Sequence, residues 1–256
     1  MARNLILFTP RTGSMYLSAL LSHNTNSINY IEHWITTPGQ EDISHLYIAA
    51  CKAKDISILY KFYGEMQKRI EFFNKRNDWV AKLTTHHAGS TCLNFVDRHI
   101  NSEDTTVWLT QRANVVDQFL SYLNAGYRQN KLKEYPGGFC YNQQTKANIS
   151  NYEYVDWPEP RVSMVLYRFI QMLMTWRQIY DRYRGKINIV SYDENILTNN
   201  FTKFGISEDD VKSYYNSNKY PVLVPTPYNR PLSNQKEWSQ CVDILRAHQH
   251  LVDINR

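Results

Sequence analysis

Short apolar runs alternate along the chain with longer stretches in which apolar residues recur at helical spacing. The short runs are rich in β-branched residues and bounded by polar ones, which is typical of buried strands. They predict strands at 5–9, 28–32, 78–87, 105–110 and 186–192. The longer stretches predict helices at 13–23, 42–53, 57–74, 91–100, 114–128 and 162–184, another capped by Ser207 with Asp210, and a last one capped by Ser233 or Asn234.

Strands that alternate with helices are typical of a parallel sheet covered by helices on both faces. The chain has 256 residues, which fits one large domain. The predicted fold class is therefore α/β, a three-layer arrangement over residues 1–256 with a central, mainly parallel sheet. Residues 130–160 are polar and aromatic and contain YPGG and WPEP, which predicts a long loop or lid.

Composition narrows the possible functions only slightly. The net charge of +5 fits an anionic ligand and fits equally a protein without one, and no Lys/Arg-rich run favours a nucleic-acid partner. The four cysteines form no CxxC motif and no Cys/His cluster, which predicts neither a zinc site nor a disulfide framework. The apolar runs are too short for a signal peptide or a membrane span, so we expect a cytoplasmic protein.

The stretch LILFTPRTGSMYL joins the first predicted strand to the first predicted helix. Ligands of parallel α/β sheets bind beyond the carboxyl ends of the strands, and this turn lies at such an end. Gly13 permits a tight turn, and the first N–H groups of the helix can converge with Arg11 and Ser14 on a phosphate or sulfate. The alternative is a plain strand-to-helix turn with an exposed arginine. The GxxxxGK[ST] signature of ATP-binding loops is absent, because no lysine precedes Ser14.

TPRTGSMYL resembles the 5′-phosphosulfate loop of the sulfotransferases that use 3′-phosphoadenosine 5′-phosphosulfate (PAPS), in particular the bacterial branch that includes trehalose 2-sulfotransferase. VWLTQRANVVDQFLSYLNA (107–125) resembles the strand, loop and helix with which that family binds the 3′-phosphate of the nucleotide. INIVSYDENIL is a weaker match to a family strand that ends in Tyr-Glu/Asp before a helix.

The resemblance implies a P-loop type of α/β fold and a sulfuryl transfer from PAPS to an acceptor hydroxyl, with 3′,5′-adenosine bisphosphate (PAP) as product. A carbohydrate or another small hydroxyl compound is the favoured acceptor. Arg112 and Ser121 match the 3′-phosphate pair, although they are nine positions apart (121 − 112) where the family has eight. Arg112 can therefore match the first arginine of a pair that is common in relatives. The other implied nucleotide contacts are Arg11, Thr12, Gly13, Ser14, Met15, Tyr16 and Arg230.

Three of the implied nucleotide contacts have a structural alternative. Tyr16 lies either near the adenine or in the core, and Arg230 either over the nucleotide or exposed beside a proline. Ser121 lies on the inward face of its predicted helix, so its alternative is a simple buried hydroxyl. Sulfuryl transfer needs a base for the acceptor hydroxyl and, by this logic, no metal. Glu32 in NYIEHWI resembles the glutamate that serves as base in the bacterial branch.

His86 is the second candidate for the base. It closes VAKLTTHH, which resembles the Lys-Thr-His strand end of the cytosolic branch with a displacement of two residues. Strand alternation puts Lys82, Thr84 and His86 on one face. A surface carboxylate and a solvated histidine are the alternatives for Glu32 and His86.

Two other functions compete with sulfuryl transfer. One is a P-loop nucleotide kinase or hydrolase, against which the missing Gly-Lys-Ser/Thr counts, and the other is a non-catalytic module that binds nucleotide or nucleic acid.

Overall fold

The computed structural model describes residues 3–30, 56–85, 93–127, 159–217 and 235–254. They contain a five-stranded sheet in the order β2-β3-β1-β4-β5. Every neighbouring pair of strands in this sheet is parallel, which confirms the predicted α/β class with a central, mainly parallel sheet. The strands are β1 (Arg3–Phe8), β2 (Ile28–Tyr30), β3 (Trp79–Thr84), β4 (Thr105–Gln111) and β5 (Asn188–Ser191).

The helices agree with the predicted ones to within a few residues where both can be compared. They are α1 (Ser14–Thr25), α3 (Ile56–Lys75), α5 (Leu93–Ile100), α6 (Val115–Tyr127), α8 (Glu159–Tyr183), α9 (Glu208–Asn216) and α10 (Gln235–Ala247). Three short turns were not predicted: η2 (Tyr192–Ile196), η3 (Thr202–Phe204) and η4 (Gln249–Val252). The predicted helix at 42–53 and nearly all of the predicted loop at 130–160 lie outside the described residues. No helix in the described part of the chain is both long and apolar enough to cross a membrane.

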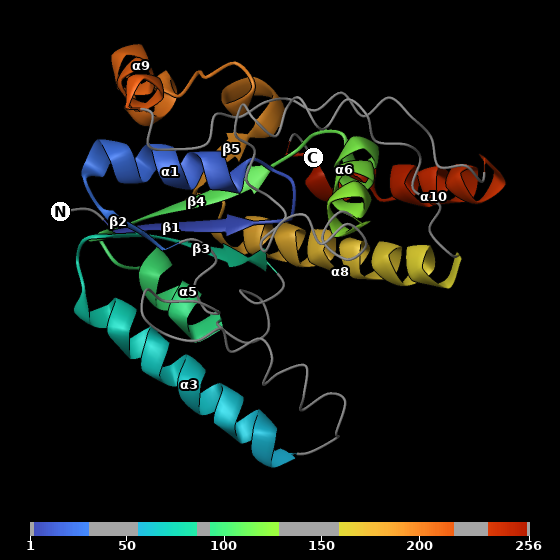
Figure 1. Cartoon of the computed structure of the whole chain (residues 1–256), viewed down its shortest axis with the longest axis horizontal. Helices are drawn as coiled ribbons and strands as arrows, with labels where there is room; N and C mark the ends of the chain where they lie inside the picture. Colours follow the sequence, from blue (N-terminus) through green and yellow to red (C-terminus); the bar gives the residue numbers. More distant parts are fainter. Residues whose placement is uncertain (1–2, 31–55, 86–92, 128–158, 218–234, 255–256) are drawn as a thin grey trace.

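The central strand β1 sends its side chains alternately into two hydrophobic layers. Leu5 and Leu7 belong to a buried cluster with residues of α3, α5, α6, α8 and α10. Ile6 belongs to a second cluster with residues of α1, η2 and α9. In Figure 1, α1 and α9 accordingly lie on one side of the sheet and α3 and α5 on the other. The alternation that the apolar runs predict thus places the sheet between two layers of helices.

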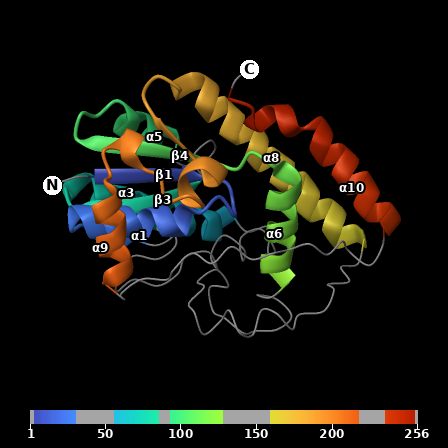
Figure 2. The same cartoon turned by 90° about the horizontal axis from the view of Figure 1, so that it is seen from above.

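Helices α6 and α8 contribute to the same hydrophobic cluster as α3 and α5, near the carboxyl ends of β1 and β4. The two helices lie next to each other (Figure 2). Their aromatic rings are in contact, with 5.2 Å between the ring centroids of Phe119 and Phe169. Buried Trp176 of α8 also reaches the sheet directly, because its Nε1 donates to the main-chain oxygen of Thr110 at 2.9 Å. Helix α8 is therefore held against both the sheet and α6.

The strand order locates a switch point between β1 and β4. From β1 the chain passes through α1 to β2 on one side of the sheet, and from β4 it passes through α6 and α8 to β5 on the other. Ligands of parallel α/β sheets bind where two neighbouring strands diverge in this way, outside their carboxyl ends. The turns 9–13 and 112–114 both follow strands that flank this point.

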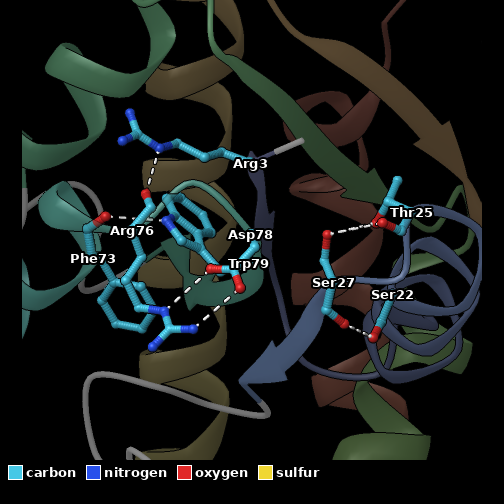
Figure 3. A network of polar contacts seen from close by, with 8 residues as sticks. All are labelled: Arg3, Ser22, Thr25, Ser27, Phe73, Arg76, Asp78 and Trp79. Atoms are coloured by element: carbon cyan, nitrogen blue, oxygen red, sulfur yellow. Dashed lines mark hydrogen bonds and ion pairs between the residues drawn. The ribbon is translucent and has the colours of Figure 1, made fainter. Parts of the chain in front are cut away.

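At the amino ends of the strands, hydrogen bonds join β1 and β3 to the residues at the end of α3 (Figure 3). Arg3 Nε donates to the main-chain oxygen of Arg76 at 2.7 Å. The Arg76 guanidinium bonds both carboxylate oxygens of Asp78, at 3.2 and 3.1 Å. Trp79 Nε1 donates to the main-chain oxygen of Phe73 at 3.1 Å. These polar groups stabilise the amino ends of β1 and β3, so their role is structural.

Candidate functional site

The turn between β1 and α1 has an unusual backbone. Arg11 has φ +67° and Gly13 has φ +74°, both in the left-handed region. For a residue with a side chain this region costs roughly 1–2 kcal/mol. Such strain persists only where surrounding contacts fix it, and it clusters at functional sites. The conformation of Arg11 is therefore an observation that points to function, independent of any resemblance.

Gly13 is required at its position for a second reason. A Cβ added to it would lie 2.6 Å from Ile196 Cδ1 and 3.1 Å from Tyr192 Cδ2. Both residues belong to η2, the turn that follows β5. The chain after β5 thus packs directly against the turn after β1, and only glycine leaves enough space between them.

Buried polar groups hold this turn from the side of the sheet. Thr12 is fully buried, and its Oγ1 donates to the main-chain oxygen of Thr9 at 2.8 Å and lies 2.5 Å from Thr110 Oγ1. Gln118 Nε2 donates to Thr9 Oγ1 at 2.8 Å and to the main-chain oxygen of Pro10 at 2.7 Å. The Thr12 hydroxyl therefore stabilises the turn, and a contact from Thr12 to a ligand would come from its main chain.

The first turn of α1 offers N–H groups without a side-chain cap. The first main-chain bond of the helix runs from Leu17 N to Gly13 O, at 3.1 Å. The N–H groups of Ser14, Met15 and Tyr16 precede it and have no acceptor within the helix. Gly13, at the N-cap, has no side chain to accept from them, and the first turn contains no acidic residue. A helix start of this kind attracts an anion through its N–H groups and its dipole.

Two residues predicted to bind the nucleotide meet at this turn. Arg11 Nε donates to Ser121 Oγ at 2.9 Å, across a separation of 110 positions. Ser121 is buried on α6, and Arg11 is half-buried. The resemblance pairs Ser121 with Arg112, whereas the structure gives its hydroxyl a donor from the first motif. The two motifs therefore contribute to one site.

Arg112 lies at the other turn of the switch point, directly after β4. Its Cζ is 4.6 Å from the centroid of the Tyr192 ring, which is a cation–π contact. Its Nε is buried and has no hydrogen-bond partner in the part of the chain that the structure describes. An unpartnered guanidinium N–H is costly, and an anionic group would satisfy it with a charge-assisted bond. Tyr192 thus lies between Gly13 and Arg112.

A buried lysine, not predicted as a site residue, adds a further positive charge. Lys82 of β3 is 1% exposed, and its Nζ lies 2.7 Å from Met15 Sδ and 4.9 Å from the centroid of the Phe8 ring. Phe8 ends β1 and Met15 lies in the first turn of α1, so the ammonium is beside both ends of the turn. The sequence holds a signal for it, since a charged residue inside the apolar strand WVAKLT is rarely buried without a role.

Tyr16 and Ser14 lie close together in the chain but have different surroundings. Tyr16 is buried, and its hydroxyl donates to Asn199 Oδ1 at 2.7 Å. Burial raises the pKa of Tyr16 strongly, and its ring packs against Tyr214 of α9 with 5.5 Å between centroids. Tyr16 therefore lies in the core, which was the alternative to a position near the adenine. The hydroxyl of buried Ser14, by contrast, makes no hydrogen bond within the described residues.

Three of the predicted site residues remain. Glu32, His86 and Arg230 all lie outside the described residues, so the assignment of the base and the role of Arg230 stay predictions. Within the described ranges no three His, Cys, Asp or Glu side chains gather into a group that could hold a metal ion.

The chain was compared with protein family models and with curated proteins, and neither comparison gave a match. The resemblance to sulfotransferases therefore stays an expectation from the sequence stretches of the β1–α1 and β4–α6 units.

Proposed function

We propose that this protein is a PAPS-dependent sulfotransferase of the P-loop type, which moves a sulfuryl group to an acceptor hydroxyl. The observation that carries the proposal is the hydrogen bond from Arg11 to Ser121 beside the uncapped first turn of α1. Both residues lie in stretches that resemble nucleotide-binding motifs of that family, and they meet at the switch point of a parallel sheet. A cytoplasmic location and a carbohydrate or small hydroxyl acceptor complete the proposal.

The donor nucleotide has two anionic ends, and the site offers two sets of positive groups. The 5′-phosphosulfate is bound by the N–H groups of α1, by Arg11 and by the Ser14 hydroxyl, with the charge of Lys82 close by. The 3′-phosphate is bound by Arg112, whose Nε has no partner among the described residues. Arg230 is proposed to close over the nucleotide.

The chemistry follows from where charge develops. As the acceptor oxygen forms a bond to sulfur, the bond from sulfur to the bridging oxygen of the 5′-phosphate breaks, and negative charge grows on the departing PAP. Sulfuryl transfer is analogous to phosphoryl transfer, in which positioning and charge stabilisation dominate. The α1 N–H groups and the neighbouring cations act on that charge. Glu32 or His86 takes the proton of the acceptor hydroxyl.

Ligand-induced stabilisation tests the nucleotide site. PAP at a hundred times its dissociation constant should stabilise the protein by ~2.7 kcal/mol, which raises the Tm by about 5–10 °C for a chain of this size. ATP should stabilise it much less. Arg11→Met should abolish the effect of PAP. Arg184→Met should leave it intact, because Arg184 follows α8 at the amino end of β5 and is exposed.

Each alternative function gives a different result. Equal or greater stabilisation by ATP with magnesium would favour a nucleotide kinase or hydrolase. Single-stranded nucleic acid that competes with PAP would favour a non-catalytic binding module. If PAP still stabilises the Arg11→Met variant, Arg11 does not bind the nucleotide and the proposal loses its main support.

Transfer of a labelled sulfuryl group to a panel of carbohydrates and small alcohols tests the activity itself. Glu32→Gln and His86→Asn are compared in this assay, and the variant that removes the base should lose about 10²–10⁴-fold in kcat. PAP binding should be unchanged in both. If PAP binds and neither substitution slows transfer, both assignments of the base are wrong.

A further inference from the structure

The turn that carries Arg112 is held by side chains from two later parts of the chain. The N–H of Ala113 donates to Asp193 Oδ2 at 3.0 Å. The carbonyl oxygen of Ala113 accepts from Gln249 Nε2. The N–H of Val115 donates to Gln249 Oε1 at 3.3 Å. The amide of Gln249 therefore bridges the turn and the first residue of α6, from 136 positions away in sequence.

The segment that carries Gln249 is itself anchored. Gln111, the last residue of β4, donates from Nε2 to the main-chain oxygen of Val252. Two residues of α8 donate to the next main-chain oxygens: Arg177 Nη1 to Asp253 at 2.8 Å and Tyr180 OH to Ile254 at 3.1 Å. Val252 is buried with a relative exposure of 2%. Gln249 thus extends from a segment that is fixed to β4 and α8.

We propose that Gln249 is a positioning residue for Arg112, and that it sets the preference of the site for a nucleotide with a 3′-phosphate. Both main-chain groups of Ala113 are bonded, so the residue before it has a defined backbone position, from which the Arg112 guanidinium lies over Tyr192. Loss of the Gln249 bonds frees one side of the turn. The proposal rests on the proposed function, because it assigns the 3′-phosphate to Arg112.

Two ligands that differ only at the 3′ position provide the test. PAP carries the 3′-phosphate and AMP lacks it, so the ratio of their dissociation constants by calorimetry reports the contribution of that group. Gln249→Met keeps the length of the side chain and removes both hydrogen bonds. It should lower the preference for PAP by about 10-fold, since a displacement of about 1 Å in a positioned group can cost up to 10²-fold. AMP affinity should be unchanged.

The matched control is Gln178→Met. Gln178 is exposed on α8 and makes no side-chain hydrogen bond within the described residues, so the preference for PAP should stay at the wild-type value. Should Gln249→Met fail to fold, Gln249→Asn keeps the amide but is one methylene too short to bridge both groups, and the same loss of preference is expected.

A double-mutant cycle distinguishes positioning from general stability. Arg112→Met should itself abolish most of the preference, and Gln249→Met should add nothing in that background. A Gln249→Met protein that keeps the full preference, or that loses PAP and AMP affinity by the same factor, would overturn the inference while leaving the proposed function intact. A wild-type protein without preference for PAP over AMP would instead overturn the assignment of the 3′-phosphate to Arg112.

Discussion

The β1–α1 and β4–α6 units lie side by side at the same edge of the sheet but begin their helices in opposite ways. At α1 the N-cap is Gly13, which has no side chain to accept from the first N–H groups. At α6 the N-cap position is occupied by Asn114, whose Oδ1 accepts from the N–H groups of Val116 and Asp117, each at 3.1 Å. The remaining donor, Val115 N, is taken by Gln249. One helix start is open and the other is closed.

The difference separates two ways of binding an anion. The open start of α1 offers main-chain donors and the positive end of the helix dipole. At the start of α6 the first N–H groups are occupied by Asn114 and Gln249, and the negative charge of Asp117 in the first turn offsets the helix dipole. At that turn the group available to an anion is a side chain, because Arg112 has an unpartnered Nε among the described residues. Each strand, turn and helix unit therefore predicts where a ligand binds. The residue before the helix, Gly13 or Asn114, determines whether the main-chain N–H groups are available to that ligand.

The largest effect is expected at the β1–α1 unit, from a side chain added at Gly13. Gly13→Ala places a methyl group against Ile196 and keeps a left-handed backbone that alanine disfavours. Strain of roughly 1–2 kcal/mol and overpacking of ~1–3 kcal/mol should together lower the free energy of unfolding by about 2–5 kcal/mol. Urea denaturation measures this change, and PAP binding should be lost.

Gly205→Ala is the matched control, because Gly205 has φ +78° but a Cβ there would meet nothing within 4 Å. It should cost only the strain of roughly 1–2 kcal/mol and leave PAP binding unchanged. Equal losses for the two variants would show that the contact with η2 does not matter, and the open unit would then tolerate a side chain at its N-cap.

The stability of the protein should depend on pH through His99, which lies away from both helix starts. This dependence decides at which pH the ligand affinities of the β1–α1 and β4–α6 units are compared. His99 of α5 is buried; its Nδ1 lies 3.0 Å from Thr105 Oγ1 and its Nε2 has no partner within the described residues. Burial, with smaller effects from Arg3 and Arg98, lowers the pKa of His99 from 6.5 to about 4. Between these values the unfolded chain binds the proton and the folded one does not, so stability falls as the pH drops from about 6.5 to about 4.

The loss should approach ~3 kcal/mol, since one pKa unit corresponds to about 1.4 kcal/mol. Urea denaturation at a series of pH values measures it. His99→Phe keeps a ring against Trp79 and Phe95 and removes the titration, so its stability should be flatter over this range. A wild-type profile as flat as that of the variant would show that His99 is not responsible. Ligand affinities of the two units are best compared above pH 6.5, where this effect is absent.

The features of the fold that sequence predicts are those decided within a few residues. Alternating apolar runs predict the strands, and the caps at Asn114 and at Ser207 with Asp210 are confirmed, because a cap bonds only the next two or three N–H groups. The strand predicted at 186–192 ends early, at Ser191. Its Oγ accepts from Glu194 N and turns the chain into η2.

The features that sequence does not predict depend on contacts between distant residues. The bond from Arg11 to Ser121 and the bridge by Gln249 join positions more than a hundred apart in sequence, with separations of 110 and 136. No local pattern marks either of them, since both partners are polar residues of a kind found on any surface. The motifs predict where anionic groups are expected, whereas the packing of η4 and α6 determines which side chains meet there.

The smallest expected effect tests whether the closed start of α6 matters for ligands or only for stability. Asn114→Ala removes the acceptor for two N–H groups and should lower the free energy of unfolding by about 1 kcal/mol, measured by urea denaturation. Ser207→Ala removes the cap of α9, far along the chain, and should cost a similar amount. Because Gln249 and Asp193 still hold Ala113, neither variant should change the preference for PAP over AMP. A loss of preference in Asn114→Ala alone would mean that the cap, and not the bridge by Gln249, positions Arg112.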